Sequence, residues 1–131
     1  MNILVIGGNR FVGKKLVVKL LSQSHEVTVL NRSASGPEGS KKIKFDRNNC
    51  DDYDYVNFNE YDCIVDMCLF KPEQFELIKN KISEKVNYIF VSSGAVDYID
   101  TNSFGDYAIE KMEVEKAISN TNLNYKIIRP S

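Results

Sequence analysis

The chain has 131 residues, and its 17 Lys and Arg residues nearly balance its 18 Asp and Glu residues, for a formal net charge of -1 at pH 7. This length suits one domain with a hydrophobic core and is short for a two-domain enzyme. The balanced charge argues against a nucleic-acid partner or an anionic membrane surface, since both favour a basic face.

The sequence also argues against a membrane or secreted protein. No apolar stretch approaches the roughly 20 residues of a membrane helix, and the N-terminus enters a strand-like segment without a signal-peptide pattern. Cys50, Cys63 and Cys68 form an odd set without metal-ligand spacing. We therefore expect free thiols in a reducing cytoplasm and no metal site.

Strand-like and helix-like patterns alternate along the chain. A Gly/Pro/Ser-rich surface loop is expected at 33–40 and another loop at 93–104, whereas the acidic, tyrosine-rich segment 48–61 fits either a short helix or loops. In chain order we expect a strand at 2–6, a helix at 11–22, strands at 26–31, 42–46 and 62–67, a helix at 72–82, a strand at 87–92, a helix at 105–119 and a strand at 124–129.

Two of the expected helices carry further information. In the first, we expect one face to contact the sheet through Val12, Leu16, Val17, Leu20 and Leu21. The last is apolar around much of its circumference, which predicts burial on two sides.

Apolar strands that alternate with helices are typical of a parallel sheet covered on both faces. The expected fold is α/β, a three-layer Rossmann-type doubly wound sheet of about six strands in the order 3-2-1-4-5-6. It would occupy residues 1–131 as one domain. In such a sheet a ligand lies beyond the carboxyl ends of the strands. Polar residues gather at those ends: Gly7 to Arg10, Asn31 and Arg32, Asp46 and Arg47, Ser92 and Ser93, and Ser131.

The turn after the first strand reads VIGGNRFVG over residues 5–13. A glycine-rich turn between a strand and a helix presents backbone N–H groups and the positive end of the helix dipole to a pyrophosphate. Gly7 would allow the sharp turn, and Gly13 would let the helix pack closely against the sheet. Arg10 stands where the usual middle glycine would be. The turn predicts a dinucleotide site, the alternative being a loop that only needs flexibility.

The second strand ends in Asn31 and Arg32, with no carboxylate for an adenosine ribose. Arg32, with Arg10 beside it, would instead clamp a 2′-phosphate. This favours NADP over NAD, unless both arginines face solvent. Asp46 would accept a hydrogen bond from the adenine amino group or would cap its own turn.

Tyr107 and Lys111 lie four residues apart and so on one face of the last helix. A lysine ammonium near a phenol favours the phenolate, which would exchange a proton with a substrate hydroxyl or carbonyl. Lys111 would also hold the nicotinamide ribose. Ser93, which follows the preceding strand, would hydrogen-bond the same substrate oxygen.

These motifs, taken in order, resemble the extended or atypical short-chain dehydrogenase/reductases. They are GGNRFVG, the NR after the second strand, FDR after the third, VSSGAV after the fifth, YAIEK and IIRPS. The nearest group in appearance is the NAD-dependent epimerase/dehydratase family, which acts on sugar nucleotides. The resemblance implies Ser93, Tyr107 and Lys111 as catalytic residues. It also implies cofactor contacts from Gly7, Gly8, Asn9, Arg10, Phe11, Val12, Gly13, Asn31, Arg32, Asp46, Arg47, Met67, Cys68 and Lys111.

Three features depart from that family. Arg10 is similar to the atypical branch, which includes chloroplast stem-loop RNA-binding relatives. Only 14 positions separate Ser93 from Tyr107, which implies a trimmed substrate loop. The chain also stops at Ser131, where the family continues into its substrate-binding part. We therefore expect either a fragment or a small protein whose pocket a partner completes.

Three functions follow as hypotheses. The first is an NAD(P)-dependent enzyme that moves hydride at a hydroxyl carbon of a sugar nucleotide or a similar small molecule. The second is a dinucleotide-binding module without catalysis, and the third, RNA binding, is opposed by the charge balance. In the resembling family the helix of Tyr107 often forms the dimer contact, so we also expect a homodimer.

Overall fold

The computed structural model describes residues 1–8, 11–101 and 103–130. It has one six-stranded sheet in the order β3-β2-β1-β4-β5-β6, with every neighbouring pair parallel. The strands are β1 (Asn2–Ile6), β2 (Glu26–Asn31), β3 (Lys41–Lys44), β4 (Cys63–Asp66), β5 (Asn87–Val91) and β6 (Asn124–Ile128). The expected fold class and strand order are confirmed.

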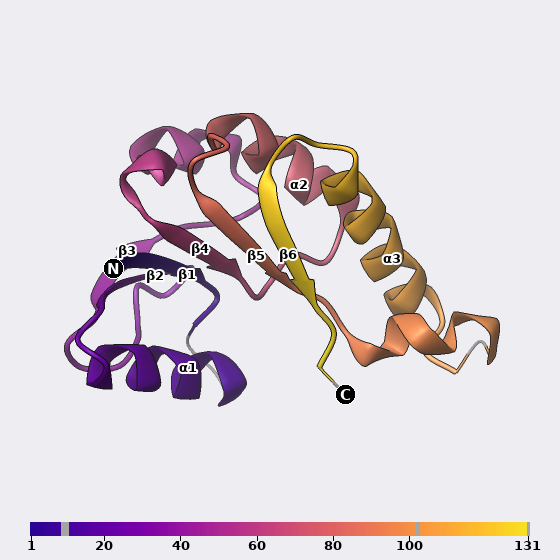
Figure 1. Ribbon diagram of the computed structural model, residues 1–131, viewed down its shortest axis with the longest axis horizontal. Helices are drawn as coiled ribbons and strands as arrows, with labels where there is room; N and C mark the ends of the chain where they lie inside the picture. The colour runs from indigo at the N-terminus through magenta and orange to yellow at the C-terminus, as the bar shows by residue number, and fades with distance from the viewer. Residues whose placement is uncertain (9–10, 102, 131) are drawn as a thin grey trace.

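The helices form the two outer layers (Figure 1). One layer is α1 (Phe11–Ser22), and the opposite face carries α2 (Pro72–Ile78) and α3 (Asp106–Ser119). Short 3-10 helices complete the connections: η1 (Cys50–Tyr55), η2 (Phe58–Glu60), η3 (Lys79–Lys81) and η4 (Gly94–Thr101). Segment 48–61 is thus two 3-10 turns. Side chains of the residues before them, Asn49 and Asn57, accept hydrogen bonds from the turns' backbone.

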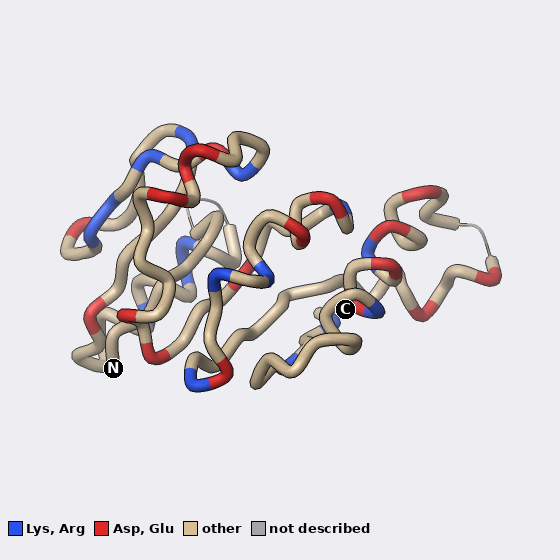
Figure 2. The backbone as a smooth tube through the Cα atoms, turned by 90° about the horizontal axis from the view of Figure 1, so that it is seen from above, with Lys and Arg blue, Asp and Glu red and all other residues tan. Residues whose placement is uncertain are grey.

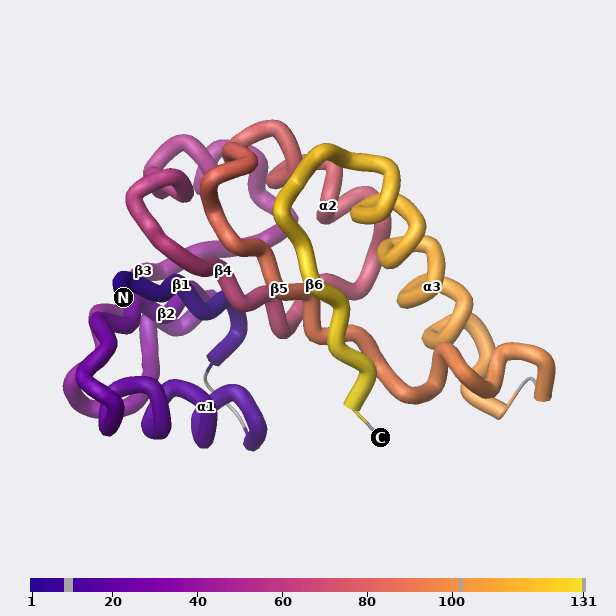
Figure 3. Tube along the Cα trace, in the orientation of Figure 1, coloured from indigo at the N-terminus to yellow at the C-terminus, as the bar shows by residue number. Residues whose placement is uncertain are grey.

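Most expected strands and helices match within one or two residues at each end, but two expected segments differ more. The helix predicted for 72–82 ends at Ile78 and continues as η3, although Ile82 is buried in the same core as Phe75. The loop predicted for 93–104 contains η4, which runs out from the sheet before the chain returns as α3 (Figure 3).

Side chains alternate between two cores because successive residues of a strand point to opposite faces. On β1, Leu4 and Ile6 face the larger core under α2 and α3, whereas Ile3 and Val5 face the core under α1. Within α1, Val17 is fully buried, and Leu16, Leu20 and Leu21 pack half-buried around it. Val12 was expected on that buried face, but it is 66% exposed, because the helix has only begun there.

Helix α3 is buried along one face, not on two sides as expected. That face consists of Ala108, Lys111, Val114, Glu115 and Ile118, whereas Tyr107 and Ile109 are exposed. Two charged residues therefore lie on the side of the helix that packs against the rest of the chain.

The sheet is covered unevenly. On the face that carries α1, the β5 side chains Ile89 and Val91 are only half-buried, and Ile128 of β6 is 50% exposed. None of the helices in the described residues is long and apolar enough to cross a bilayer.

Candidate functional site

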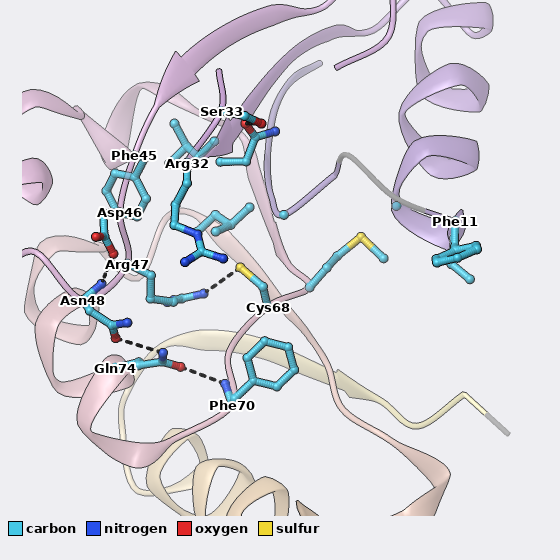
Figure 4. Close-up of a pocket in the computed structure, with 17 residues that line it drawn as sticks. Phe11, Arg32, Ser33, Phe45, Asp46, Arg47, Asn48, Cys68, Phe70 and Gln74 are labelled. Carbon is cyan, nitrogen blue, oxygen red and sulfur yellow. Dashed lines mark hydrogen bonds between the residues drawn. The ribbon is translucent and has the colours of Figure 1, made fainter. Parts of the chain in front are cut away.

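A cavity of about 760 Å³ opens beyond the carboxyl ends of β1 to β4 (Figure 4). This is the edge at which an open parallel sheet binds ligands. Its wall is made by the turn after β1, the ends of β2, β3 and β4, and the start of α2. Ten residues predicted to contact a cofactor line it: Gly7, Phe11, Val12, Gly13, Asn31, Arg32, Asp46, Arg47, Met67 and Cys68.

Three glycines shape the first wall. Gly7 has φ +88, and a Cβ there would lie 3.0 Å from the Cβ and Sγ of Cys68. At Gly8 a Cβ would lie 2.8 Å from Val5 Cγ1 and 2.9 Å from Val17 Cγ2, between sheet and helix. At Gly13 it would meet Gly8 Cα at 3.0 Å and Gly7 O at 3.1 Å. The close approach of helix to sheet, predicted for Gly13, thus occurs at Gly8, and Gly13 packs against the turn.

The predicted residues Asn9 and Arg10 lie outside the described residues. Gly8 is buried behind the cavity wall. The beginning of α1 beside them leaves Phe11 and Val12 exposed at the cavity mouth, 86% and 66% respectively.

The second wall follows β2. Asn31 uses its side chain to order the next loop, because its Oδ1 accepts from Ser35 N at 3.0 Å and its Nδ2 donates to Ser35 O at 2.6 Å. The Arg32 side chain is exposed and extends into the cavity, with its guanidinium near Cys68 in the view of Figure 4. The cavity therefore offers a cationic group at the position where the second strand ends.

The third wall follows β3. Asp46 caps the turn that it begins, since its Oδ1 accepts from Asn48 N at 2.9 Å. This is one of the two roles that the sequence allows for it. Its neighbour Arg47 turns inward and is only 7% exposed.

Arg47, which lines the cavity, belongs to a buried ion pair. Arg47 donates from Nη1 and Nη2 to the two oxygens of Asp66 on β4, at 2.5 and 2.7 Å, and Tyr88 on β5 donates to Asp66 Oδ2 at 2.6 Å. Tyr53 donates to the carbonyl of Arg47 at 2.8 Å. Burial opposes the Arg47 charge, but the facing Asp66 carboxylate raises the pKa of Arg47 well above its usual range. Burial and the Asp66 charge also raise the pKa of Tyr88, which keeps its proton.

Lys111, the predicted catalytic lysine, does not line the cavity and is 2% exposed. Its Nζ donates to the Leu69 carbonyl at 2.8 Å and lies 4.6 Å from the centroid of the Phe70 ring. The ring of Tyr107, about one turn earlier in α3, has its centroid 5.9 Å away. Burial lowers the pKa of Lys111.

The two serines after β5 have different environments. Ser93 is half-buried, and its Oγ accepts from Ala95 N at 3.1 Å as η4 begins. Ser92 is buried, and its Oγ donates to Glu115 Oε2 at 2.6 Å. Arg129, which follows β6, forms a two-pronged pair with the same Glu115 carboxylate. The hydroxyl of Ser93, rather than that of Ser92, therefore remains near the surface.

Several residues in or near the candidate site were not predicted. Asp66 interrupts an otherwise apolar strand, and a charge in such a place normally has a buried partner. Glu115 follows Lys111 by four residues on the buried face of α3, a spacing that could have identified it. Gln74 and Phe70 also line the cavity, but no pattern in the sequence marks them. Within the described ranges, no group of three His, Cys, Asp or Glu side chains could hold a metal.

Comparison with known proteins gives three kinds of similarity. The model of a family described as the NAD dependent epimerase/dehydratase family matches residues 3–72. The chloroplast stem-loop binding protein of 41 kDa b from Arabidopsis thaliana is 26% identical over 98% of this chain, which spans 41% of that protein's length.

Solved structures show the same fold. A short-chain dehydrogenase/reductase from Veillonella parvula has a TM-score of 0.78 at 15% identity, over 98% of this chain and 67% of its own. The UDP-glucose 4-epimerase of Thermotoga maritima, solved with UDP-glucose, has a TM-score of 0.71 at 18% identity, over 98% of this chain and 55% of its own.

Proposed function

The chain belongs to the NAD-dependent epimerase/dehydratase family, whose model matches more than half of it, and on this premise we propose a nicotinamide dinucleotide-dependent oxidoreductase or epimerase of a small molecule. The substrate class we propose is a hydroxyl or carbonyl compound, with a nucleotide sugar as the first candidate. The free cysteines Cys50, Cys63 and Cys68 fit the expected cytoplasmic location.

The observation that carries the proposal is the packing of the glycine turn against the cavity. A Cβ at Gly7 or Gly13 would meet Cys68 or the turn's own backbone at about 3 Å, so only glycine keeps the turn this close to the cavity wall. The helix that follows directs its N-terminal end toward the same cavity, which suits a pyrophosphate. The residues present therefore fit a dinucleotide.

We propose NADP as the preferred form. Arg32 extends into the cavity after β2 (Figure 4), and neither Asn31 nor Arg32 offers the carboxylate that would bind a ribose 2′-hydroxyl. An arginine binds a phosphate with two parallel hydrogen bonds, which favours the 2′-phosphate.

In the proposed reaction, the nicotinamide supplies or accepts the hydride. Tyr107, whose side chain is 44% exposed, would pass a proton to or from the substrate oxygen. Ser93 would donate a hydrogen bond to the same oxygen, and the Lys111 ammonium would stabilise the phenolate of Tyr107. The oxygen that changes charge during hydride transfer would thus be held by two hydroxyl groups.

The test combines binding with turnover. Enhanced fluorescence of NADPH on titration with the protein would measure affinity, and a screen of nucleotide sugars and small carbonyls would measure hydride transfer. We expect Tyr107→Phe to bind NADPH as wild type does and to lose activity by ~100-fold or more, because general acid-base transfer contributes that much. Full activity in Tyr107→Phe would remove this mechanism.

A second candidate is a dinucleotide-binding module without catalysis. The burial of Lys111 outside the cavity lining favours it. In the titration above, tight NADPH binding without turnover of any substrate would support this alternative.

Two further proposals have their own tests. Similarity to a stem-loop binding protein suggests RNA binding, but basic and acidic residues are interspersed along the chain (Figure 2), and phosphate binding needs a basic face. A labelled stem-loop whose electrophoretic mobility shifts in a salt-dependent manner would establish it.

We also propose a homodimer through the exposed face of α3 near Tyr107 and Ile109. A sedimentation mass equal to that of one chain would contradict it.

A further inference from the structure

The connection between β4 and α2 separates Lys111 from the cavity. Leu69 is fully buried, and its carbonyl oxygen accepts a hydrogen bond from the Lys111 ammonium at 2.8 Å. The next residue, Phe70, lines the cavity, is 45% exposed, and has its ring centroid 4.6 Å from Lys111 Nζ. Phe90 covers the ammonium from another side, with its ring centroid at 5.1 Å. The ammonium thus lies among three aromatic rings and one carbonyl, and a ligand in the cavity would meet Phe70 before it met Lys111.

Gln74, in the first turn of α2, holds this connection in place. Its Oε1 accepts from Phe70 N at 2.9 Å and from Lys71 N at 3.2 Å. Its Nε2 donates to Asn48 Oδ1 at 3.1 Å, across to the turn that follows β3. Figure 4 shows the chain of hydrogen bonds from Asn48 through Gln74 to Phe70 along one side of the cavity. One side chain therefore ties the backbone of Phe70 to the opposite wall.

We propose that Phe70 is a gate between the cavity and Lys111, and that Gln74 latches this gate to Asn48. The inference rests on the proposed function, since it states how the nicotinamide half of the ligand reaches Lys111. With the gate closed, Lys111 is held by Leu69 and cannot contact a ribose. Opening requires the Phe70 ring to turn away and the ammonium to leave the Leu69 carbonyl. The aromatic rings stabilise the Lys111 ammonium in the closed state. Opening therefore costs free energy, and we expect it to be a step separate from ligand binding.

The gate is tested first without any ligand, by the reactivity of Lys111. Acetylation by sulfo-N-hydroxysuccinimidyl acetate, quantified by peptide mass spectrometry, reports how often the ammonium is accessible. We expect Phe70→Ala to raise the Lys111 rate by ~10-fold or more relative to wild type, since removing the cover lowers the cost of local opening. Phe70→Leu keeps an apolar cover and should raise it less. Exposed Lys116, on the same helix, is the internal reference. An unchanged Lys111 rate in Phe70→Ala would overturn the gate.

The latch has a matched pair of variants. Gln74→Glu still accepts from Phe70 N and Lys71 N but cannot donate to Asn48, so Lys111 should react several-fold faster than in wild type. Asn48→Asp keeps an acceptor for Gln74 Nε2, so in this variant Lys111 should be acetylated at the wild-type rate. Equal rates in Gln74→Glu and wild type would remove Gln74 from the proposal.

Ligand binding supplies the second measurement. In stopped-flow mixing with NADPH, wild type should show a slow phase whose rate levels off with concentration, and Phe70→Ala should lose it. 2′,5′-ADP, which lacks the nicotinamide half, should bind wild type without that phase. A slow phase that persists in Phe70→Ala would contradict the gate. Failure of both NADPH and NADH to bind would refute the proposed function, whereas the acetylation result would still decide the gate.

Discussion

The two halves of the site are built differently. Around β1 to β3, the cavity wall consists of backbone turns and glycines whose positions are fixed by close packing. Around β5, β6 and α3, Ser93, Tyr107 and Lys111 depend on side-chain orientation, and one of them is buried behind Phe70. A surface made of main chain is complete as soon as the sheet forms. A set of side chains from separate elements can rearrange, so the half that carries the proposed catalytic residues is the one that a ligand would have to remodel.

The largest expected effect is at the junction of the halves. Asp66→Asn leaves the buried Arg47 charge without its counter-ion, and breaking a buried ion pair in this way costs about 3–5 kcal/mol. We expect urea denaturation to show a loss of that size. The double variant Arg47→Met with Asp66→Asn removes both charges and should recover part of the stability. If Asp66→Asn alone were as stable as wild type, the ion pair would not be what joins the two halves.

Gly13→Ala tests the main-chain half. The new Cβ would meet Gly8 Cα at 3.0 Å and Gly7 O at 3.1 Å, neither of which can move without shifting the turn. Overpacking of this kind costs about 1–3 kcal/mol. NADPH affinity should fall by ~10-fold or more, equivalent to about 1.4 kcal/mol. Gly36→Ala, in a loop outside the cavity, is the control, because its Cβ would meet no backbone atom closely: it would lie 3.3 Å from Ser40 Oγ and at ordinary contact distance, 3.5 Å, from Val29 Cγ2. Equal NADPH affinity in both variants would contradict the prediction.

Glu115→Gln tests the side-chain half. Burial opposes the charge, but hydrogen bonds from Arg129 and Ser92 lower the pKa of Glu115, so its carboxylate stabilises the fold above the usual glutamate pKa of about 4.3. We expect the free energy of unfolding to fall by about 1–2 kcal/mol at pH 7. The value is modest because the Arg129 side chain is 40% exposed.

That loss should disappear as the pH falls through the lowered pKa, where wild type also becomes protonated. Urea denaturation at pH 7 and at acid pH measures it, with Glu113→Gln, exposed on the same helix, as the control. If NADPH affinity remains as in wild type while turnover falls, the two halves are independent. A pH-independent loss would show that the carboxylate charge is not what Glu115 contributes.

The smallest expected effect concerns cofactor choice. Arg32→Ala should weaken NADPH binding by about fivefold, equivalent to about 1 kcal/mol for an exposed ion pair, and leave NADH binding unchanged. Lys44 is exposed on β3 and does not line the cavity, so Lys44→Ala controls for the loss of one positive charge from the protein surface. An equal loss for NADH and NADPH would show that Arg32 does not recognise the 2′-phosphate.

The sequence predicts the main-chain half better than the side-chain half for a physical reason. The strands and the turn at Gly7 follow from apolar periodicity and from glycine's conformational freedom, which are local properties, and the strand order follows from the general rules for doubly wound sheets. The contact of Gln74 with Asn48, or of Lys111 with the Leu69 carbonyl, joins residues 26 and 42 positions apart, and no local pattern encodes it. Val12 was misplaced for a related reason: helical periodicity gives the buried face but not how far along the helix the sheet reaches.

Strand β6 is an edge strand of the sheet, and within the described part of the chain its outer edge pairs with no other strand. An open row of main-chain donors and acceptors invites another strand, whether from a neighbouring molecule or from an aggregate. Lys126 lies at the middle of this strand and is exposed. A charged side chain on an edge strand disfavours pairing with a further strand, so we expect Lys126 to weaken self-association at this edge.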